Sequence, residues 1–512
     1  MRGDVDKPDR IVGRSRQWAA LERFVFDGFS ADAAAQPLRL GLVSGRRRTG
    51  KTQILTSMSE AAGGLYAACV QDEGDRAARA RFAEAIARHA GLAPAYPPAS
   101  AGRMSTEPDS WERLLRAALE TSTRTTPSGV PPLVVIDEFP YLTANAPQLP
   151  SLIQHIYDDA QNGRGPGGRL ILCGSALSVM HELLSGAKPL RGRAMMDMRL
   201  TALDFREAAR LWGITDPAVA LRVHACVGGI PGYRPLIPAT PATVADFDDW
   251  VAENLLAVDV AVFTRTEVDY LLREDPRISA RALYYDILSA IAAGATTPTK
   301  IGTAVGKDDN AVRYPLGVLE STGYITKTAD LLHTRKPVIA MSDPVIRFDR
   351  LITAPSLGQL ELGRGRQVWT AAAPAFRSGI LGPHFEELAR DWILRFAPDE
   401  LNRPAGFGTI GSANVHDHTA RTKHEIDVLA LDGKRVTVIG EAKATLDRRG
   451  LPDLERLERI KALLATMGYD TSGTLLTLFS TTGFTTDLER TAGTRDDAEL
   501  VDLDRLYGQR QG

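Results

Sequence analysis

The sequence predicts an α/β fold in which a parallel sheet comes first, helices follow, and a second α/β region ends the chain. Three observations support this prediction. Apolar strand-like runs at 38–43, 64–70, 133–136 and 170–173 alternate with helical stretches, as they do in parallel α/β sheets. A glycine-rich turn joins the first of these runs to a helix. Farther along, two apolar runs flank Asp432-Gly433, which is a strong signal for a β-hairpin.

Composition and charge narrow the class of protein. The 512 residues are 44% hydrophobic and 24% charged, which is ordinary for a globular chain of about three or four domains. A net charge of −2 gives no overall basic surface, so any contact with DNA must be local. The cysteines form no metal or disulfide pattern, which favours a reducing, cytoplasmic setting; they are Cys69, Cys173 and Cys226. No signal peptide and no membrane-spanning run is visible, so we expect no membrane partner.

The glycine-rich turn carries the strongest signal for a ligand. It reads Gly45-Arg46-Arg47-Arg48-Thr49-Gly50-Lys51-Thr52 and lies between a strand-like run and a helix opening, the context of a P-loop. Backbone N–H groups of such a turn bind phosphate oxygens, and the helix dipole adds to the attraction. Lys51 is expected to reach the β- and γ-phosphates, and the Thr52 hydroxyl to complete the shell of Mg²⁺. ATP and Mg²⁺ are therefore the predicted cofactors. The three arginines either add charge near the phosphates or point to solvent.

A second strand ends in two acids. The apolar run 133–136 is followed by Asp137 and Glu138, which places two carboxylates at the edge of the sheet where ligands bind. Asp137 would hold Mg²⁺, directly or through water, and Glu138 would orient or deprotonate the attacking water. Alone, such a pair is more often a helix cap or a solvated turn. After a P-loop, it predicts a hydrolytic site.

Further polar residues have two interpretations each. Ser175, after the strand-like run 170–173, either touches the γ-phosphate or the attacking water, or caps a helix. Arg191 and Arg193 lie in a glycine turn, where either could act in trans as an arginine finger in a homo-oligomer; otherwise the turn is a solvated basic one. The turn at 228–233 either touches the nucleotide or merely connects helices.

The middle of the chain predicts helices and then a small mixed module. Three helices and two strands at 281–350 have the order of a winged helix, a variant of the helix-turn-helix. This stretch has nine Lys or Arg and seven Asp or Glu, so its basic excess is only two, and contact with protein competes with contact with DNA. We expect a P-loop ATPase core, a helical lid, the winged helix, a Pro- and Gly-containing linker and a last α/β domain, over 1–202, 203–280, 281–350, 351–380 and 381–512.

The hairpin near the C-terminal end carries a second set of chemical groups. Glu441 and Lys443 are two residues apart in a strand and share a face. A strict two-residue turn sets Asp427 opposite Val438, on the other face, so a longer turn or a bulge is needed to bring the acids together.

If the acids meet, Asp427 and Glu441 would bind Mg²⁺ or Mn²⁺ through oxygen, and Glu386 on the preceding helix could add a carboxylate. Lys443 would position the attacking water and stabilise the developing charge. The alternative is that these acids and the lysine are simply solvated at the ends of a hairpin.

Two family resemblances follow from these residues. Over roughly 10–350 the chain resembles the archaeal-type ATPase family of prokaryotes, P-loop proteins close to the AAA+ and STAND classes; the matching motifs are Val12-Gly13-Arg14, the P-loop, Asp137-Glu138-Phe139-Pro140-Tyr141, Gly174-Ser175, and the turns at 189–193 and 228–233. This resemblance implies ATP binding and hydrolysis, with Arg193 at the finger position. Over about 381–470, Glu386, Asp427 and Glu441-x-Lys443 resemble the PD-(D/E)xK, restriction-endonuclease-like superfamily, with Ile426 in place of the usual proline.

Two functions are compatible with this organisation. One is an ATP-regulated, metal-dependent DNA nuclease of genome defence or DNA processing. The other is a non-cutting ATPase switch, or a regulator of transcription type, whose winged helix and C-terminal domain only bind.

Overall fold

The computed structural model describes residues 5–28, 37–92, 110–126, 129–258, 262–278, 280–333, 337–399, 401, 406–417 and 421–509. The chain forms two compact units, and each is described by itself. The first comprises Met1–Leu203 with two short later segments, Ile230–Gly232 and Glu274–Pro276. The second comprises Asp204–Gly229, Tyr233–Arg273 and Arg277–Gly512. In the described residues, no helix combines the length and the apolar character needed to cross a membrane.

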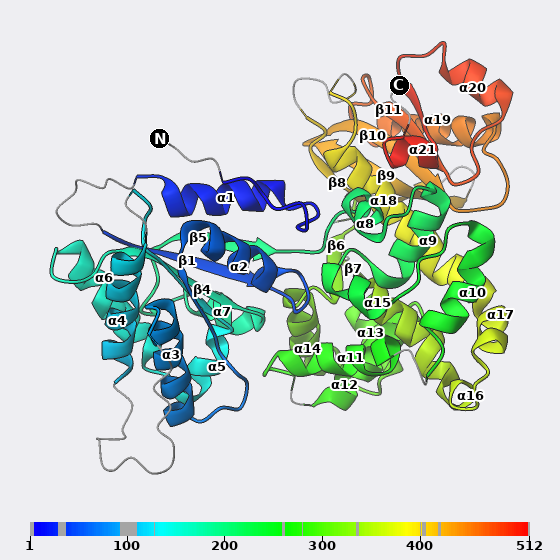
Figure 1. Ribbon diagram of the computed structural model, residues 1–512. Coiled ribbons are helices and arrows are strands. Elements are labelled where there is room, and N and C mark those ends of the chain that lie inside the picture. The colour runs from blue at the N-terminus through cyan, green and yellow to red at the C-terminus, as the bar shows by residue number, and fades with distance from the viewer. Residues whose placement is uncertain are drawn as a thin grey trace. The chain divides into compact units, whose positions relative to one another are not determined.

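A five-stranded parallel sheet forms the centre of the first unit (Figure 1). Its strands lie in the order β2 (Leu65–Ala68), β3 (Leu133–Asp137), β4 (Gly168–Gly174), β1 (Leu38–Gly45) and β5 (Ala194–Leu200). All neighbouring pairs are parallel, which confirms the predicted class of sheet. The sequence did not predict β5, because its alternately exposed side chains belong to an edge strand. The carboxyl ends of all five strands meet at one edge, where ligands bind in such sheets.

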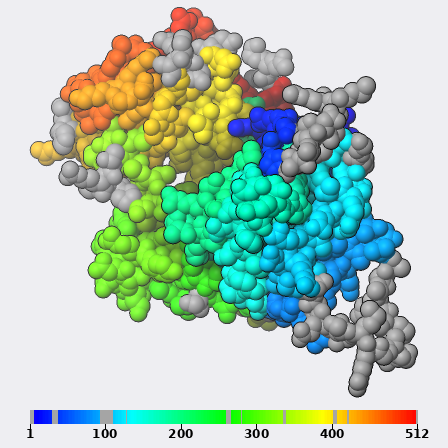
Figure 2. Space-filling model, turned by 90° about the vertical axis from the view of Figure 1, so that its left-hand side faces the viewer, coloured from blue at the N-terminus to red at the C-terminus, as the bar shows by residue number. Residues whose placement is uncertain are grey.

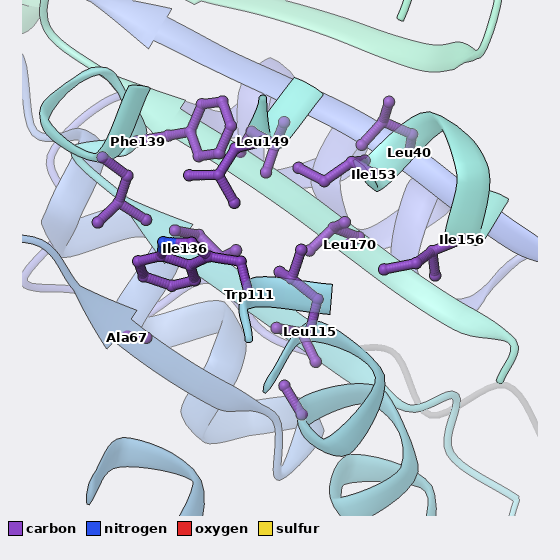
Figure 3. Close-up of a cluster of buried hydrophobic side chains, with 14 of the residues drawn as sticks. Leu40, Ala67, Trp111, Leu115, Ile136, Phe139, Leu149, Ile153, Ile156 and Leu170 are labelled. Atoms are coloured by element: carbon purple, nitrogen blue, oxygen red, sulfur yellow. The ribbon is translucent and has the colours of Figure 1, made fainter. Parts of the chain in front are cut away.

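Helices cover both faces of this sheet. Helices α1 (Ser15–Phe26) and α2 (Lys51–Ala62) pack on one face. The other face is covered by α3 (Asp75–His89), α4 (Trp111–Thr125), α5 (Phe139–Asn145), α6 (Leu149–Gln161) and α7 (Leu177–Glu182). Figure 3 shows this second core, in which Trp111 and Leu115 of α4 gather with Ile153 of α6 against Ile136 and Leu170 of the sheet. This buried apolar surface fixes the strands whose ends carry the polar site.

The second unit begins with helices. They are α8 (Phe205–Trp212), α9 (Pro217–Val227), η1 (Pro231–Leu236, mostly in this unit), α10 (Val244–Asn254) and α11 (Val262–Glu274). Three further helices, α12 (Arg281–Ala292), α13 (Pro298–Ala304) and α14 (Asp309–Ser321), precede an antiparallel pair, β6 (Ile325–Ala329) and β7 (Pro337–Met341). The three helices and two strands thus come in the predicted order. Aspartate side chains accept the first backbone N–H groups of α8, α9 and α14, which explains where these helices begin.

The prediction of a linker over 351–380 is wrong, because this segment is helical and packed. It follows α15 (Pro344–Phe348) and is made of η2 (Asp349–Thr353), η3 (Ala354–Ser356), α16 (Leu357–Leu360), α17 (Gly365–Ala375) and η4 (Phe376–Leu381), which runs directly into α18 (Gly382–Arg395). Trp369 and Phe376 are buried against Phe247 of α10, with ring centroids 5.9 and 5.7 Å away. Gly365 serves close packing, since a Cβ there would lie 3.2 Å from the carbonyl oxygen of Ala252.

A mixed five-stranded sheet ends the chain. Its order is β12 (Ala498–Val501), β11 (Leu475–Ser480), β10 (Arg435–Lys443), β9 (Thr422–Asp432) and β8 (Thr409–Asp417). The pairs among β8, β9 and β10 are antiparallel, whereas β10, β11 and β12 run parallel. Helix α19 (Leu451–Thr466) packs on the sheet, with α20 (Thr486–Ala492) and α21 (Leu503–Leu506) beyond it. In Figure 2 the yellow and orange residues of this part lie together at the top.

The hairpin of β9 and β10 contains the expected irregularity. Its turn is Gly433-Lys434, one residue later than the sequence indicates, because Asp432 pairs with Arg435. The pairing then changes register between Val436 and Val438, so Thr437 is an extra residue in β10. These two shifts together move β10 far enough for Glu441 to come to the same end of the ladder as Asp427. The sequence predicted a longer turn or a bulge, and the structure has a bulge.

Candidate active sites

The P-loop lies between β1 and α2 and has the close backbone packing that its glycines permit. A Cβ on Gly45 would lie 2.6 Å from the carbonyl oxygen of Leu200, so no larger residue fits there. Gly50, at the N-cap of α2, has φ +92°, a conformation that favours glycine. The Thr49 hydroxyl donates to the carbonyl of Arg46 at 2.7 Å and stiffens the loop. The start of α2 therefore directs backbone N–H groups and the positive end of its dipole toward this loop.

Lys51 and Thr52 are the last two residues of the P-loop and the first two residues of α2. Lys51 is buried, and its Nζ donates to the carbonyls of Gly45 at 2.7 Å and Arg46 at 3.1 Å. The Thr52 hydroxyl donates to Oδ2 of Asp137 at 2.8 Å, which joins the first turn of α2 to the end of β3. A hydroxyl and a buried carboxylate side by side are ligands that suit Mg²⁺. These residues fit a nucleotide with its magnesium ion: the loop and Lys51 would hold the phosphates, and Thr52 and Asp137 the metal.

Tyr66 on β2 also belongs to this site, although the sequence pattern did not predict it. Its hydroxyl donates to Oδ2 of Asp137 at 2.5 Å. Burial, and then the charge of Asp137, raise the pKa of Tyr66 well above its ordinary value, so the phenol keeps its proton. This contact could be predicted only by knowing that β2 lies beside β3. Tyr66 pairs with Val135, which is two residues before Asp137 and on the same face of β3.

Glu138 and Ser175 are brought together by the adjacency of β3 and β4. Both the backbone N–H and the hydroxyl of Ser175 donate to Oε2 of Glu138, at 3.1 and 3.0 Å. The helix-cap interpretation of Ser175 is wrong, because Ala176 is the N-cap of α7 and no side chain caps that helix. Glu138 itself has φ +54°, which is uncommon for a residue with a side chain and occurs often at functional sites. Its carboxylate is therefore fixed in direction.

The arginines of the turn at 189–193 are engaged within the chain. Arg193 donates to both carboxylate oxygens of Asp158 on α6, from Nε at 3.0 Å and from Nη2 at 2.9 Å. This bidentate contact lowers the pKa of Asp158. Arg191 donates to the carbonyl of Gly186 at 2.6 Å. A role of Arg193 in trans therefore requires Arg193 to leave Asp158.

Two later segments of the first unit lie against the P-loop. The backbone N–H of Gly232 donates to the carbonyl of Arg48 at 2.9 Å, and a Cβ on Gly232 would lie 2.5 Å from that of Arg48. The turn at 228–233 therefore contacts the loop as well as connecting helices. Burial raises the pKa of Glu274 to about 7, whereas the charges of Lys51, Arg47 and Arg46 lower it. Arg46 and Arg47 of the loop, like Lys51, therefore interact electrostatically with the carboxyl group of Glu274.

Asp427, Glu441 and Lys443 meet in the second unit, at one end of the β9–β10 ladder. Nζ of Lys443 lies 3.2 Å from Oδ2 of Asp427 and 3.1 Å from Oε1 of Glu441. Both carboxylates are buried, and the backbone N–H of Ala442 donates to Asp427 at 2.9 Å. Burial disfavours the charged form of Lys443, but the two carboxylates outweigh it and raise the pKa of the lysine. The ammonium therefore stays protonated between the two acids.

Glu441 has one carboxylate oxygen to spare. Its Oε1 takes Lys443 and Arg456 of α19, while Oε2 is buried without a hydrogen-bond partner among the described residues. A buried acceptor without a partner is costly, and a divalent cation would satisfy it. Asp427 and Glu441 thus fit the predicted metal.

Glu386 on α18 lies close to these acids, but the three carboxylates are not already arranged as a set of metal ligands. Burial, and then the charge of Asp427, raise the pKa of Glu386 to about 7, while Arg390 lowers it. Across the residues that the structure describes, no group of three His, Cys, Asp or Glu side chains is arranged to hold a metal. The contribution of Glu386 as a ligand stays a prediction.

Comparisons with known proteins agree with the fold of the first unit. No family model matches the chain. An uncharacterized protein of Methanocaldococcus jannaschii, MJECL04, is 26% identical over 308 residues, which are 59% of this chain and 64% of the relative, so the chain spans less than two thirds of the relative's length. The Walker-type ATPase PABY2304 of Pyrococcus abyssi has 18% identity and a TM-score of 0.50, over 68% of this chain and 99% of its own.

A more distant structural neighbour is the ORC2 protein of Aeropyrum pernix, with 14% identity and a TM-score of 0.40 over 73% of this chain and 98% of its own. At the identity of the Pyrococcus protein, a structural match shows the fold alone. The five-stranded parallel sheet therefore has the fold of a P-loop ATPase.

Proposed function

We propose that this chain binds and hydrolyses ATP with Mg²⁺, and that its ATPase controls a metal-dependent DNA nuclease site in the C-terminal sheet. Such a combination suits genome defence or DNA processing. One observation carries the ATPase part: Thr52 and Asp137 are hydrogen-bonded to each other at 2.8 Å beside Lys51. This contact joins the phosphate-binding loop to the acid that ends β3.

Each residue of the first site has a role in hydrolysis. Backbone N–H groups of the P-loop and the ammonium of Lys51 bind and orient the phosphates. Thr52 and Asp137 hold Mg²⁺, which supplies positive charge to the phosphate oxygens when bound. Glu138 accepts a proton from the attacking water, and Ser175 keeps that carboxylate in one orientation.

The C-terminal residues support phosphodiester cleavage. Asp427 and Glu441 would hold Mg²⁺ or Mn²⁺, which supplies a water of lowered pKa when bound. Lys443 lies between both acids and would stabilise charge that develops on the phosphate. The observation that favours a cation here is that Oε2 of Glu441 is buried and has no hydrogen-bond partner among the residues that the structure describes.

The remaining assignments complete the proposal. Helices α12–α14 with β6 and β7 are a winged helix that binds DNA or a protein partner, and Arg193 acts as a finger between copies in a homo-oligomer. The domain limits proposed are 1–202, 203–280 and 281–350, with the nuclease-like domain over 381–512.

The first experiment measures ATP binding by calorimetry and ATP hydrolysis for the wild type, Lys51→Ala and Glu138→Gln. Lys51→Ala should lose binding, and Glu138→Gln should bind ATP but turn over at least about a hundredfold more slowly. Lys188→Ala, on an exposed lysine, is the matched control. A wild type that binds no ATP would refute the ATPase.

The second experiment measures cleavage of DNA with Mg²⁺ or Mn²⁺, with and without ATP. Asp427→Ala and Lys443→Ala should abolish cleavage, whereas Asp432→Asn, at the exposed hairpin turn, should not. Cleavage that survives Asp427→Ala would refute the nuclease site.

A non-cutting switch is the second candidate function. Arg456 and Lys443 both bind Oε1 of Glu441, and Lys443 also binds Asp427, so cations of the chain itself already neutralise the two acids. This function predicts DNA or partner binding that depends on the nucleotide and is lost in Lys51→Ala, with no cleavage under any metal.

A further inference from the structure

A cavity of about 720 Å³ lies in the second unit and opens beside the C-terminal acids. Glu386 and Lys443 are among its lining residues. Helices α9, α10 and α17 also line it, and their apolar side chains there include Leu221, Phe247 and Trp369. Volumes of this size are typical of pockets that enclose a small molecule or one part of a larger one. Of the groups proposed for cleavage, Glu386 and Lys443 thus line this hollow of the second unit.

Cations also line this cavity. Arg222 of α9 donates to the carbonyl of Ala218 at 2.8 Å, and Arg377 of η4 is exposed. Within the described part of the chain neither arginine forms an ion pair. Both guanidinium groups are therefore available to an anion, and a phosphate accepts two parallel hydrogen bonds from such a group.

Acids also line the cavity. Asp248 accepts a hydrogen bond from Nε1 of Trp369 at 2.8 Å, and its charge also acts on Arg222. Asp447 lies on the exposed loop after β10, at the rim. Glu386 belongs to the candidate metal site. The lining thus combines apolar side chains and two arginines with Glu386 and Lys443 of the proposed nuclease site.

We propose that this cavity receives an unpaired nucleotide, so that the nuclease site acts on single-stranded DNA, free ends and flaps. The inference rests on the proposed nuclease function and names its substrate class. An unpaired nucleotide offers an apolar base to the walls and a phosphate to Arg222 or Arg377, with the next phosphate beside Lys443. A duplex cannot enter, because its bases are stacked and paired, and extruding one costs free energy that a single strand does not need.

The test uses the full-length protein with Mn²⁺ and one oligonucleotide sequence in three forms: single-stranded, fully paired, and paired with an unpaired flap. We expect the single strand and the flap to be cut at least about tenfold faster than the duplex. Arg377→Glu should remove most of this preference by slowing cleavage of the single strand and the flap. Arg364→Glu, an exposed arginine that does not line the cavity, is the matched control.

Binding separates this inference from the nuclease itself. With Asp427→Ala, fluorescence anisotropy should give at least about tenfold tighter binding of the single strand than of the duplex, and the added Arg377→Glu should abolish that difference. Equal cutting and equal binding of single strand and duplex would overturn the cavity assignment while the nuclease stands. Selective single-strand binding without cleavage by the wild type would refute cutting and leave the cavity assignment in place.

Discussion

Ser175 donates two hydrogen bonds to a single oxygen of Glu138, one from its backbone N–H at 3.1 Å and one from its hydroxyl at 3.0 Å. The two residues follow neighbouring strands, β4 and β3, so the contact ties the carboxyl ends of these strands together. It also fixes the acid best placed to accept a proton from water. The orientation of that carboxylate therefore depends on a side chain that itself needs no charge.

Ser175→Ala removes one of these hydrogen bonds and leaves the backbone one. We expect the turnover rate of ATP hydrolysis to fall at least about tenfold, because a hydrogen bond to a charged group is worth about 1.5–3 kcal/mol. The affinity for ATP should not change, since the P-loop is untouched. Steady-state kinetics and calorimetry measure the two quantities. Ser175→Thr, which keeps the hydroxyl, should retain most of the activity, and weaker ATP binding at normal turnover would contradict this role.

Tyr66→Phe removes a donor from Asp137 while Thr52 keeps its own contact. We expect the Mg²⁺ concentration for half-maximal ATP hydrolysis to rise at least about tenfold, since groups that orient metal ligands typically contribute that much affinity. A magnesium titration of the ATPase measures this effect. Tyr157→Phe, on α6, serves as the control. An unchanged titration would show that Asp137 is held without Tyr66.

The sequence predicted the parallel sheet and the P-loop because both depend on residues that are close together in the chain. It could not predict that Tyr66 reaches Asp137, since this contact depends on β2 lying beside β3. The pairing of Ser175 with Glu138 likewise depends on strand order.

Packing explains why the segment 351–380 is helical although a linker was predicted there. The glycine and proline content of 351–380 indicated a linker, but Gly365 is there because a backbone carbonyl approaches it closely. Composition alone does not distinguish a glycine that bends a chain from one that lets two helices touch. The bulge in β10 was predicted only in part. The positions of the acids required a longer turn or a bulge, but they did not indicate which of the two forms or at which residue.

Thr437 stabilises that bulge with its hydroxyl, which donates to the carbonyls of Phe407 at 2.6 Å and Ala430 at 3.2 Å. Thr437→Val keeps the shape and removes the donor, so the free energy of unfolding should fall by about 1–2 kcal/mol. Binding of Mn²⁺ should weaken, because Asp427 and Glu441 share an end of the ladder only through the bulge.

Chemical denaturation and Mn²⁺ calorimetry measure these two effects of Thr437→Val. Thr422→Val, at the exposed start of β9, should change neither quantity. If the Thr437→Val protein is less stable but binds Mn²⁺ with full affinity, the hydrogen bonds at the bulge are not needed for metal binding.

Glu274 predicts a dependence of stability on pH. Its pKa rises from 4.5 to about 7 on folding, so the folded protein binds a proton that the unfolded chain has released between these values. The contribution of Glu274 to stability therefore falls as pH rises through this window and is constant above it. Glu274→Gln should match the wild type near pH 4 and exceed its free energy of unfolding by up to about 3 kcal/mol at pH 8.

Chemical denaturation of wild type and Glu274→Gln across this pH range measures the difference directly. Glu386 has a raised pKa in the same range, but it is present in both proteins and does not affect the comparison. A constant difference at all pH values would show that Glu274 does not titrate in this window.

The first unit takes its last residues from far along the chain, at Ile230–Gly232 and Glu274–Pro276. No single cut in the gene can therefore release it whole. A fragment that ends at residue 203 would keep the P-loop, Asp137 and Glu138, but the carbonyl of Arg48 would lose the N–H of Gly232. The arginines of the loop would also lose the buried carboxyl of Glu274. If recombination between related chains exchanges everything after residue 203, it therefore also replaces the residues at 230–232 and 274–276 that belong to the unit of the P-loop.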